Sequence, residues 1–256
     1  MPTLETYPQT LRVEIERGNH IHSFDVPAHK NQTVLDVVSW VQQNADPTLS
    51  YRFSCRVGMC GSCAMMVNGV PRWTCRTHMS KVTDGRRQVR IGPLRNLPLI
   101  KDLAVDMDPF FDKWVEAGGV HQGNLTRDED MAQVDETSPA RQAANEGIEC
   151  INCSVCYAAC DTVAGNPGYL GPAALQRVWT LYRDEKVADA DKAALLEGVS
   201  GKGGCHNCHS MGSCTALCPN DLDPMAAITG LKRASAKSFA QSFPRSFTQS
   251  FLKRKS

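Results

Sequence analysis

Apolar and polar residues alternate over three short segments between residues 9 and 110, and this pattern predicts strands. A period of two gives a strand one apolar face, which packs on a core, and one polar face. The first two segments follow each other closely, as the two strands of a hairpin do. The apolar positions are Leu11, Val13 and Ile15, then Phe24 and Val26, and finally Val89 and Ile91.

A helix and a tight turn are predicted between these strands. Thr33 and Asp36 stand three residues apart, as the two residues of a capping box do, and apolar residues follow at helical spacing. Asn68-Gly69 stands between two apolar runs and is a strong signal for a two-residue hairpin turn. The apolar face of the predicted helix consists of Val34, Val37, Val38 and Val41.

The second half of the chain favours helices. Residues 172–182 and 189–196 carry helical spacing, and Pro172 stands near the start of the first segment, where proline is tolerated. Residues 111–145 contain a stretch that is rich in Gly, Asp and Gln, and its weak periodicity predicts an exposed linker region. We therefore expect an α+β protein, with a small mixed domain over residues 9–110 and a helical domain over residues 146–235.

Residues 236–256 form a tail in which phenylalanines recur every four residues, followed by a basic end. One interpretation is a helix whose ring-bearing face and lysines suit an anionic lipid surface. Pro244 interrupts that helix, and we therefore expect a disordered, low-complexity tail. The phenylalanines are Phe239, Phe243, Phe247 and Phe251.

Composition and charge narrow the function classes. The net charge is +1, so no strong electrostatic field favours a nucleic acid partner. No stretch approaches the about 18 consecutive apolar residues of a membrane-spanning helix, and the N-terminus lacks the basic and apolar regions of a secretory signal. Twelve cysteines in a chain that is not expected to be exported favour metal binding over disulfides.

The first group of cysteines has the C-x4-C-x2-C spacing of a plant-type [2Fe–2S] site, and the Asn-Gly hairpin folds a fourth cysteine back towards it. Gly58 and Gly61 lie in the loop, where backbone must approach sulfide at φ values that other residues resist. These features predict a β-grasp, ferredoxin-like domain, and a structural zinc site is the alternative. The predicted ligands are Cys55, Cys60, Cys63 and Cys75.

The second group has the C-x2-C-x2-C-x3-C run of two-cluster ferredoxins, in which three thiolates bind one cluster and the fourth binds its neighbour. A complementary set ends at Cys218-Pro219, but Met211 stands at its middle position, and a thioether cannot carry the charge of a thiolate. Counting ligands therefore gives one [4Fe–4S] and one [3Fe–4S] cluster. The predicted ligands are Cys150, Cys153, Cys156 and Cys218 for the former, and Cys160, Cys208 and Cys214 for the latter.

Alternatives exist for this second group. Zinc would not explain four thiolates within eleven residues, and disulfides between such close neighbours would be strained. The segment from Cys205 to His209 matches the C-x-x-C-H motif of covalent haem, but haem would remove Cys208 from the second cluster. Cys205 has no place among the eleven ligands. It is either a reduced, partly buried thiol or a fourth ligand that makes the second centre [4Fe–4S].

Three clusters in one chain predict a relay that moves single electrons, with no substrate chemistry and no catalytic residue in this chain. The motifs, in order and spacing, resemble the iron–sulfur subunit of the succinate dehydrogenase/fumarate reductase family. The resemblance extends over residues 9–235. It is carried by residues 50–63, 101–108, 150–160, 171–175 and 208–219.

The resemblance implies two partners. One is a flavoprotein whose FAD interconverts succinate and fumarate, and the other is a membrane anchor that binds quinone and often haem b. Electrons would pass from flavin through the [2Fe–2S], [4Fe–4S] and [3Fe–4S] clusters to quinone, or in reverse. The chain would then lie peripherally on the cytoplasmic face of the inner membrane, or on the matrix side in a mitochondrion. The alternative is an iron–sulfur carrier of a soluble fumarate reductase or of another flavoenzyme, without an anchor.

The resemblance also marks His209 and Lys232 as positions near the quinone and the [3Fe–4S] cluster. An ordinary loop histidine and a solvated lysine are the alternatives. Asp161 stands where the family usually has proline, and Ala164 and Gly165 stand where many succinate dehydrogenases have two tryptophans. The resemblance therefore does not assign the quinone type.

Overall fold

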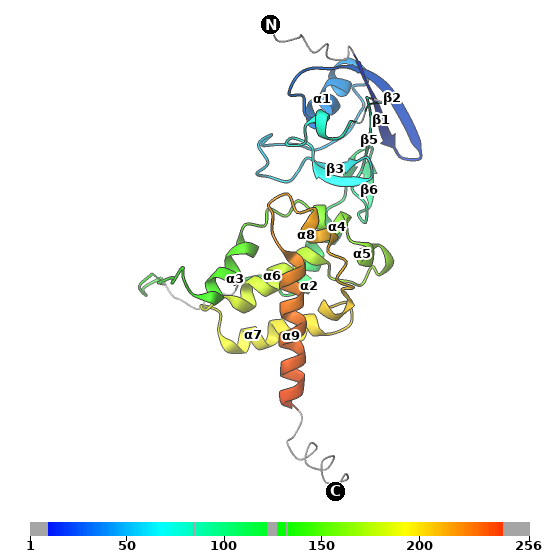
Figure 1. The fold of residues 1–256 in the computed structure, drawn as a ribbon. Coiled ribbons are helices and arrows are strands. Elements are labelled where there is room, and N and C mark those ends of the chain that lie inside the picture. Colours follow the sequence, from blue (N-terminus) through cyan, green and yellow to red (C-terminus); the bar gives the residue numbers. More distant parts are fainter. Residues whose placement is uncertain (1–9, 84, 86, 122–126, 132, 243–256) are drawn as a thin grey trace.

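The computed structural model describes residues 10–83, 85, 87–121, 127–131 and 133–242. A strand-rich part formed by the first half of the chain sits on a helical part formed by the second half (Figure 1). The predicted α+β class is confirmed. Within the described ranges, none of the helices has the length and apolarity that crossing a bilayer requires.

The strand-rich part is built on a five-stranded mixed sheet in the order β2-β1-β5-β3-β4. The central strand β5 runs parallel to β1 and antiparallel to β3, and the other neighbours pair antiparallel. The three segments with alternating residues are β1, β2 and β5, as predicted. The strands are β1 (Thr10–Arg17), β2 (His20–Pro27), β3 (Ala64–Val67), β4 (Val70–Trp73) and β5 (Gln88–Gly92), with a separate pair β6 (Leu99–Lys101) and β7 (Ala104–Val105).

The helix α1 (Val34–Asn44) has the predicted capping box and apolar face. The Thr33 hydroxyl accepts from the backbone N–H of Asp36, and the Asp36 carboxylate accepts from the backbone N–H of Thr33. The four valines of its predicted face are fully buried in one cluster with the sheet. This cluster is the core of the strand-rich part.

The predicted Asn-Gly turn joins β3 to β4. Asn68 and Gly69 have φ values of 50° and 78°, and Val67 pairs with Val70 on either side of them. Positive φ at both central residues is the geometry whose twist matches an antiparallel hairpin. The turn fixes the register of β3 and β4, and so fixes where the segments before and after them meet.

The helical part packs around α6 (Pro172–Arg183), which contacts α2, α3, α4, α7 and α9. A buried apolar cluster that includes Tyr169, Leu175 and Leu231 forms its core. The remaining helices are α2 (Asp108–Glu116), α3 (Pro139–Ile148), α4 (Val155–Ala158), α5 (Asp161–Gly165), α7 (Asp189–Ser200), α8 (Ser213–Ala216) and α9 (Pro224–Ser242), with 3-10 turns η1 (Met79–Lys81) and η2 (Cys205–Asn207).

Two segments differ from what the sequence predicts. The end of α2 and all of α3 lie within residues 111–145 and the start of the next segment, where an exposed linker was expected. The helix α3 packs on α6 through small residues, Ala144 and Gly147, and a Cβ on Gly147 would overlap Thr180. Small residues bury a helix face without giving it a strong hydropathy pattern.

The helix α9 continues through Ser242, seven residues into the stretch expected to be a disordered tail. Alanine, lysine and glutamine in this stretch are good helix formers, and they extend the helix beyond its packed portion. Phe239 lies on this helix. The expectations for Phe243, Pro244, Phe247 and Phe251 concern residues outside the described ranges.

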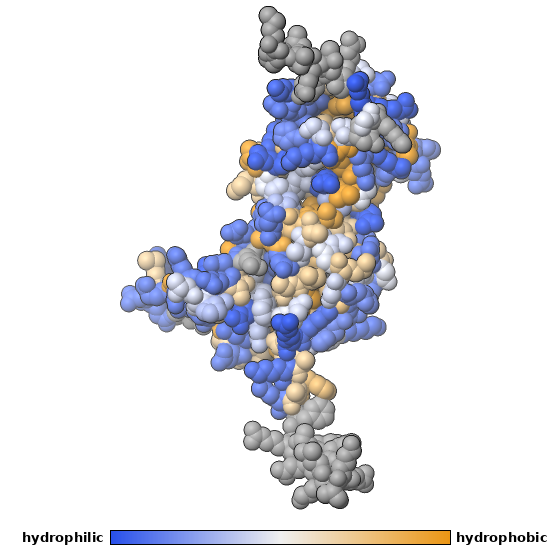
Figure 2. Space-filling model, viewed as in Figure 1, coloured by the Kyte–Doolittle hydropathy of each residue, from blue (hydrophilic) through white to orange (hydrophobic). Residues whose placement is uncertain are grey.

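The two parts share one buried cluster at their junction. It joins Trp73 and Leu94 of the strand-rich part to Val155 and Ala158 of α4. Asn96 adds polar contacts, because its side-chain amide donates to the carbonyls of Tyr157 and Cys160 at 2.9 and 3.1 Å. Figure 2 shows apolar residues on the visible face along the strand-rich part and the junction, above a mostly hydrophilic lower surface.

Candidate metal centres

The first cysteine group is brought together by the β3–β4 hairpin. Cys63 precedes β3 directly, and the Thr74 hydroxyl after β4 donates to the Cys63 carbonyl at 2.7 Å. The hairpin thereby returns Cys75 to the loop, as predicted. Cys55 and Cys60 bond to each other's sulfurs through their backbone N–H groups, at 3.5 Å and 3.3 Å.

Hydrogen-bond donors converge on the sulfurs of this loop. The backbone N–H groups of Val57 and Met59 lie 3.4 and 3.2 Å from the Cys55 sulfur, and the Ser62 hydroxyl lies 3.0 Å from the Cys60 sulfur. Burial opposes ionisation of Cys60, but hydrogen bonds from the Cys55 backbone and from Ser62 outweigh it and lower its pKa to about 6. The loop therefore favours the thiolate, which is the form that binds metal.

Gly58 and Gly61 adopt the positive φ values expected of them, +78° and +71°. The close approach that glycine permits is to protein atoms. A Cβ on Gly58 would lie 3.0 Å from Trp73 and Arg76, and one on Gly61 would lie 2.7 Å from the Cα of Cys153. The first cysteine loop therefore rests directly on a cysteine of the second group.

The four predicted [4Fe–4S] ligands line one cavity at the junction. Cys150, Cys153 and Cys156 come from the segment before and within α4, and Cys218 follows α8. Asn152 and Ser154, with φ of 58° each, turn the backbone so that this short segment wraps around the cavity.

Burial makes these thiols hard to ionise without a metal. It raises the pKa of Cys153 to about 11 and that of Cys156 well above its usual range, and neighbouring cysteines raise the latter further. A bound cationic metal reverses this, because a coordinating thiol is deprotonated outright. Four soft donors around one space fit an iron–sulfur cluster.

The three predicted [3Fe–4S] ligands line a second cavity. Cys160 lies at the start of α5, and Cys208 and Cys214 belong to the segment between η2 and α8. Met211 and His209 line the same cavity, and 68% of Met211 is exposed. Burial raises the pKa of Cys214 to about 11, which again favours a bound metal as the partner of the thiolate.

Lys232 and Cys205 flank this second cavity. The Lys232 ammonium donates to the Cys208 carbonyl at 2.6 Å, and its side chain is half-buried rather than solvated. Cys205 is fully buried, and its sulfur does not line either cysteine cavity of the described chain. Burial raises its pKa. These placements agree with a reduced, buried Cys205 thiol.

All twelve cysteines are free thiols in the described chain. Among the described residues, no three His, Cys, Asp or Glu side chains are grouped as ligands of a single metal ion. In an iron–sulfur cluster, by contrast, each cysteine binds its own iron, so the sulfurs stand farther apart than around one zinc ion.

Two family models match the chain. The 2Fe-2S iron-sulfur cluster binding domain matches residues 7–112, and the 4Fe-4S dicluster domain matches residues 149–223. The fumarate reductase iron-sulfur subunit of Haemophilus influenzae is 33% identical over 236 residues, which are 88% of this chain and 90% of the relative. That of Mycobacterium tuberculosis is 36% identical over 232 residues, 88% of this chain and 90% of the relative.

This chain belongs to the family of iron–sulfur subunits of fumarate reductase and succinate dehydrogenase. The succinate dehydrogenase [ubiquinone] iron-sulfur subunit 2 of Oryza sativa, a mitochondrial member of the family, is 34% identical over 84% of this chain and 69% of the relative. A solved structure titled "Mycobacterium smegmatis Sdh1 complex in the apo form" has the same fold, with a TM-score of 0.79 at 23% identity, over 91% of this chain and 98% of that one.

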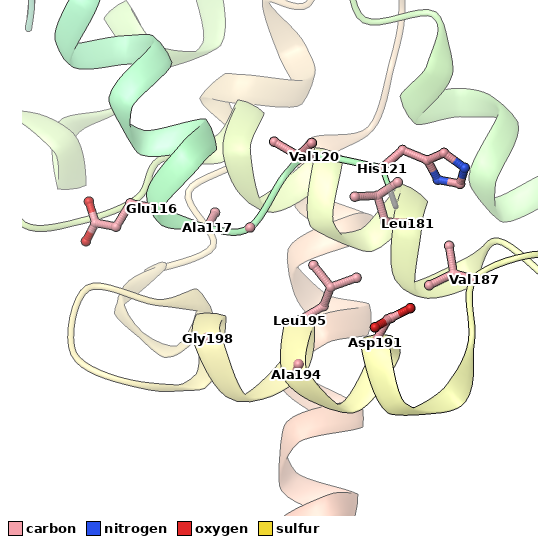
Figure 3. Close-up of a pocket in the computed structure, with 11 residues that line it drawn as sticks. Glu116, Ala117, Val120, His121, Leu181, Val187, Asp191, Ala194, Leu195 and Gly198 are labelled. Carbon is pink, nitrogen blue, oxygen red and sulfur yellow. The ribbon is translucent and has the colours of Figure 1, made fainter. Parts of the chain in front are cut away.

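Two features of this family member were not predicted from its sequence. Trp73 lines the cavity of the second cysteine group although it belongs to the strand-rich part, and no local pattern indicates that contact. A separate cavity of about 410 Å³ lies away from the cysteines, between the end of α2, α6 and α7 (Figure 3). Leu181 and Leu195 line it together with the polar Glu116 and Asp191.

Proposed function

We propose that this chain relays single electrons through three iron–sulfur clusters, between a flavoprotein and quinone at a membrane anchor. The clusters would be a [2Fe–2S], a [4Fe–4S] and a [3Fe–4S] centre. When bound, they supply one-electron chemistry, and the protein holds and insulates them. The proposed ligands are, in that order, Cys55, Cys60, Cys63 and Cys75; Cys150, Cys153, Cys156 and Cys218; Cys160, Cys208 and Cys214.

The observation that carries the proposal is the continuity of the three cysteine groups. Gly61 of the first loop touches Cys153 of the second group, and α4 leads within four residues from Cys156 to Cys160 of the third. Electron transfer between centres requires short separations, and a linear series of adjoining sites supplies them. The residues between the sites are buried and apolar, so they exclude water from the path.

The two ends of this series differ in a way that supports two partners. Phe53, Val57 and Met59 expose apolar surface around the first loop, with 40%, 58% and 70% of each residue accessible. Exposed apolar surface beside a functional site is typical of a protein interface, here proposed for the FAD-bearing flavoprotein. At the other end, His209 and Lys232 flank the third cysteine group, where the quinone and an anchor with haem b would lie.

The proposal places the subunit peripherally on the cytoplasmic face of the inner membrane, or on the matrix side in a mitochondrion. Membrane fractionation tests this placement. Co-purification with a flavoprotein and a haem-b anchor supports the full relay. A cluster-loaded chain that associates with a flavoprotein alone supports a soluble carrier instead.

Electron paramagnetic resonance of anaerobically purified protein tests the clusters themselves. We expect a three-iron signal in the oxidised sample, a [2Fe–2S] signal in the reduced sample, and about nine irons per chain. Stoichiometric zinc in a colourless, silent sample would contradict the relay.

A further inference from the structure

Trp73 is a residue of the strand-rich part that reaches the second cysteine group. It ends β4, is 8% exposed, and lines the cavity that contains Cys150, Cys153, Cys156 and Cys218. Its indole N–H is buried and has no hydrogen-bond partner among the described residues. A buried donor without an acceptor costs free energy, so its position calls for an acceptor that arrives with the bound group.

The packing around Trp73 fixes where its ring points. On the sheet side, Trp73 pairs with Ala64 across the β3–β4 hairpin. Gly58 lies against the ring so closely that a Cβ there would be 3.0 Å from it. On the helical side, Val155 and Ala158 of α4 belong to the same buried cluster. The ring is therefore held from both parts of the molecule.

The sulfur of Cys153 is the acceptor that this arrangement provides. Burial raises the pKa of Cys153, the backbone N–H of Val155 lowers it, and the Trp73 indole N–H lowers it too. The indole N–H therefore already favours negative charge on this sulfur. The contact of Gly61 with the Cα of Cys153 keeps the two parts in register at the same point.

We propose that Trp73 donates its indole N–H to the Cys153 sulfur of the bound [4Fe–4S] cluster and so raises the reduction potential of that cluster. The inference rests on the proposed function. Reduction adds one electron, which the neighbouring [2Fe–2S] centre can supply, and increases the negative charge on the cluster sulfurs. A donor stabilises the reduced form more than the oxidised form, and no proton is transferred. Trp73 is thus a positioning and tuning residue.

The decisive experiment is a potentiometric titration of the [4Fe–4S] signal by electron paramagnetic resonance, in the intact complex with Trp73→Phe. At a fixed potential near the midpoint, the ratio of reduced to oxidised cluster is expected to fall about tenfold, which for one electron is about 59 mV. The matched control is Trp114→Phe. The Trp114 indole N–H is also buried without a partner in the described chain, but Trp114 does not line the cysteine cavity, so the potential should not change.

A second substitution removes only the N–H group. At position 73, an analogue of tryptophan in which sulfur replaces the indole N–H keeps the bicyclic shape, and it serves if Trp73→Phe fails to assemble. It should lower the [4Fe–4S] potential and shift the iron–thiolate stretching bands in resonance Raman spectra. A potential equal to that of wild type overturns the proposal. Failure of the proposed function is distinguishable, because wild-type protein would then lack the three cluster signals.

Discussion

The loop of Cys55 and Cys60 and the cavity of Cys150 to Cys156 hold their sulfurs in opposite ways. In the loop, backbone N–H groups and the Ser62 hydroxyl surround the sulfurs and lower the pKa of Cys60 to about 6. In the cavity, burial raises the pKa of Cys156 well above its usual range. The loop stabilises thiolates by itself, whereas the cavity depends on metal charge to do so.

Cys75 shows that this difference follows burial rather than domain. It belongs to the first group, but it is buried behind the hairpin, and burial with the neighbouring Cys63 raises its pKa to about 12. The exposed edge of the first site is therefore stabilised by hydrogen bonds, and its inner edge resembles the cavity. This division suits a site that faces a partner on one side and the next centre on the other.

Loss of a single thiolate should have the largest effect, and it should separate the two regions. Cys156→Ser is expected to remove the [4Fe–4S] cluster, about four irons per chain, because a hydroxyl is a poor ligand for this centre. The helical part should also lose stability, since the other cysteines of the cavity would remain buried without metal charge. Iron analysis and thermal unfolding measure both effects.

Cys60→Ser is the matched substitution in the loop. It should remove only the [2Fe–2S] cluster, about two irons per chain, and leave the signals of the helical part unchanged. Equal iron loss and equal destabilisation in the two variants would contradict the comparison.

The contact between the two regions can be broken at Gly61. Gly61→Ala should cost about 1–2 kcal/mol for its positive φ and about 1–3 kcal/mol more because its Cβ would overlap Cys153. The displaced loop should also slow electron transfer from the first centre to the second. Urea unfolding and stopped-flow reduction measure the two effects.

Gly69→Ala is the control, because Gly69 has a similar φ of +78° and no atom within 4 Å of the added Cβ. It should carry the backbone cost alone, with unchanged electron transfer. If both variants transfer electrons at the wild-type rate, the Gly61 contact does not set the spacing of the two centres.

The sequence could predict features that depend on neighbours along the chain. The capping box of α1 and the Asn68-Gly69 turn are local, and the cysteine spacings place sulfurs that the structure then brings into shared cavities. The contact of Trp73 with the cavity joins segments about eighty residues apart, and no periodicity encodes it. The helix α3 was missed because Ala144 and Gly147 bury its face without large apolar side chains.

The hydrogen bonds of the loop can be weakened without touching a cysteine. Ser62→Ala removes the donor 3.0 Å from the Cys60 sulfur, at a cost of about 0.5–1.5 kcal/mol to the thiolate, and should raise its pKa by up to about one unit. In iron-depleted protein, alkylation of Cys60 should therefore reach its half-maximal rate at a higher pH than the value near 6 of the wild type. An unchanged pH profile would mean that backbone donors alone stabilise the thiolate.

The smallest effect is expected at Cys205, and it decides how many thiolates the second cavity supplies. Cys205 is buried beside η2 and does not line that cavity of the described chain, so Cys205→Ala should remove only packing, about 1 kcal/mol of stability. The oxidised three-iron signal should persist with full intensity, because Cys160, Cys208 and Cys214 are unchanged. A variant that loses iron from this centre would make Cys205 a ligand. The cavity would then depend on four thiolates, and Met211 would no longer explain its composition.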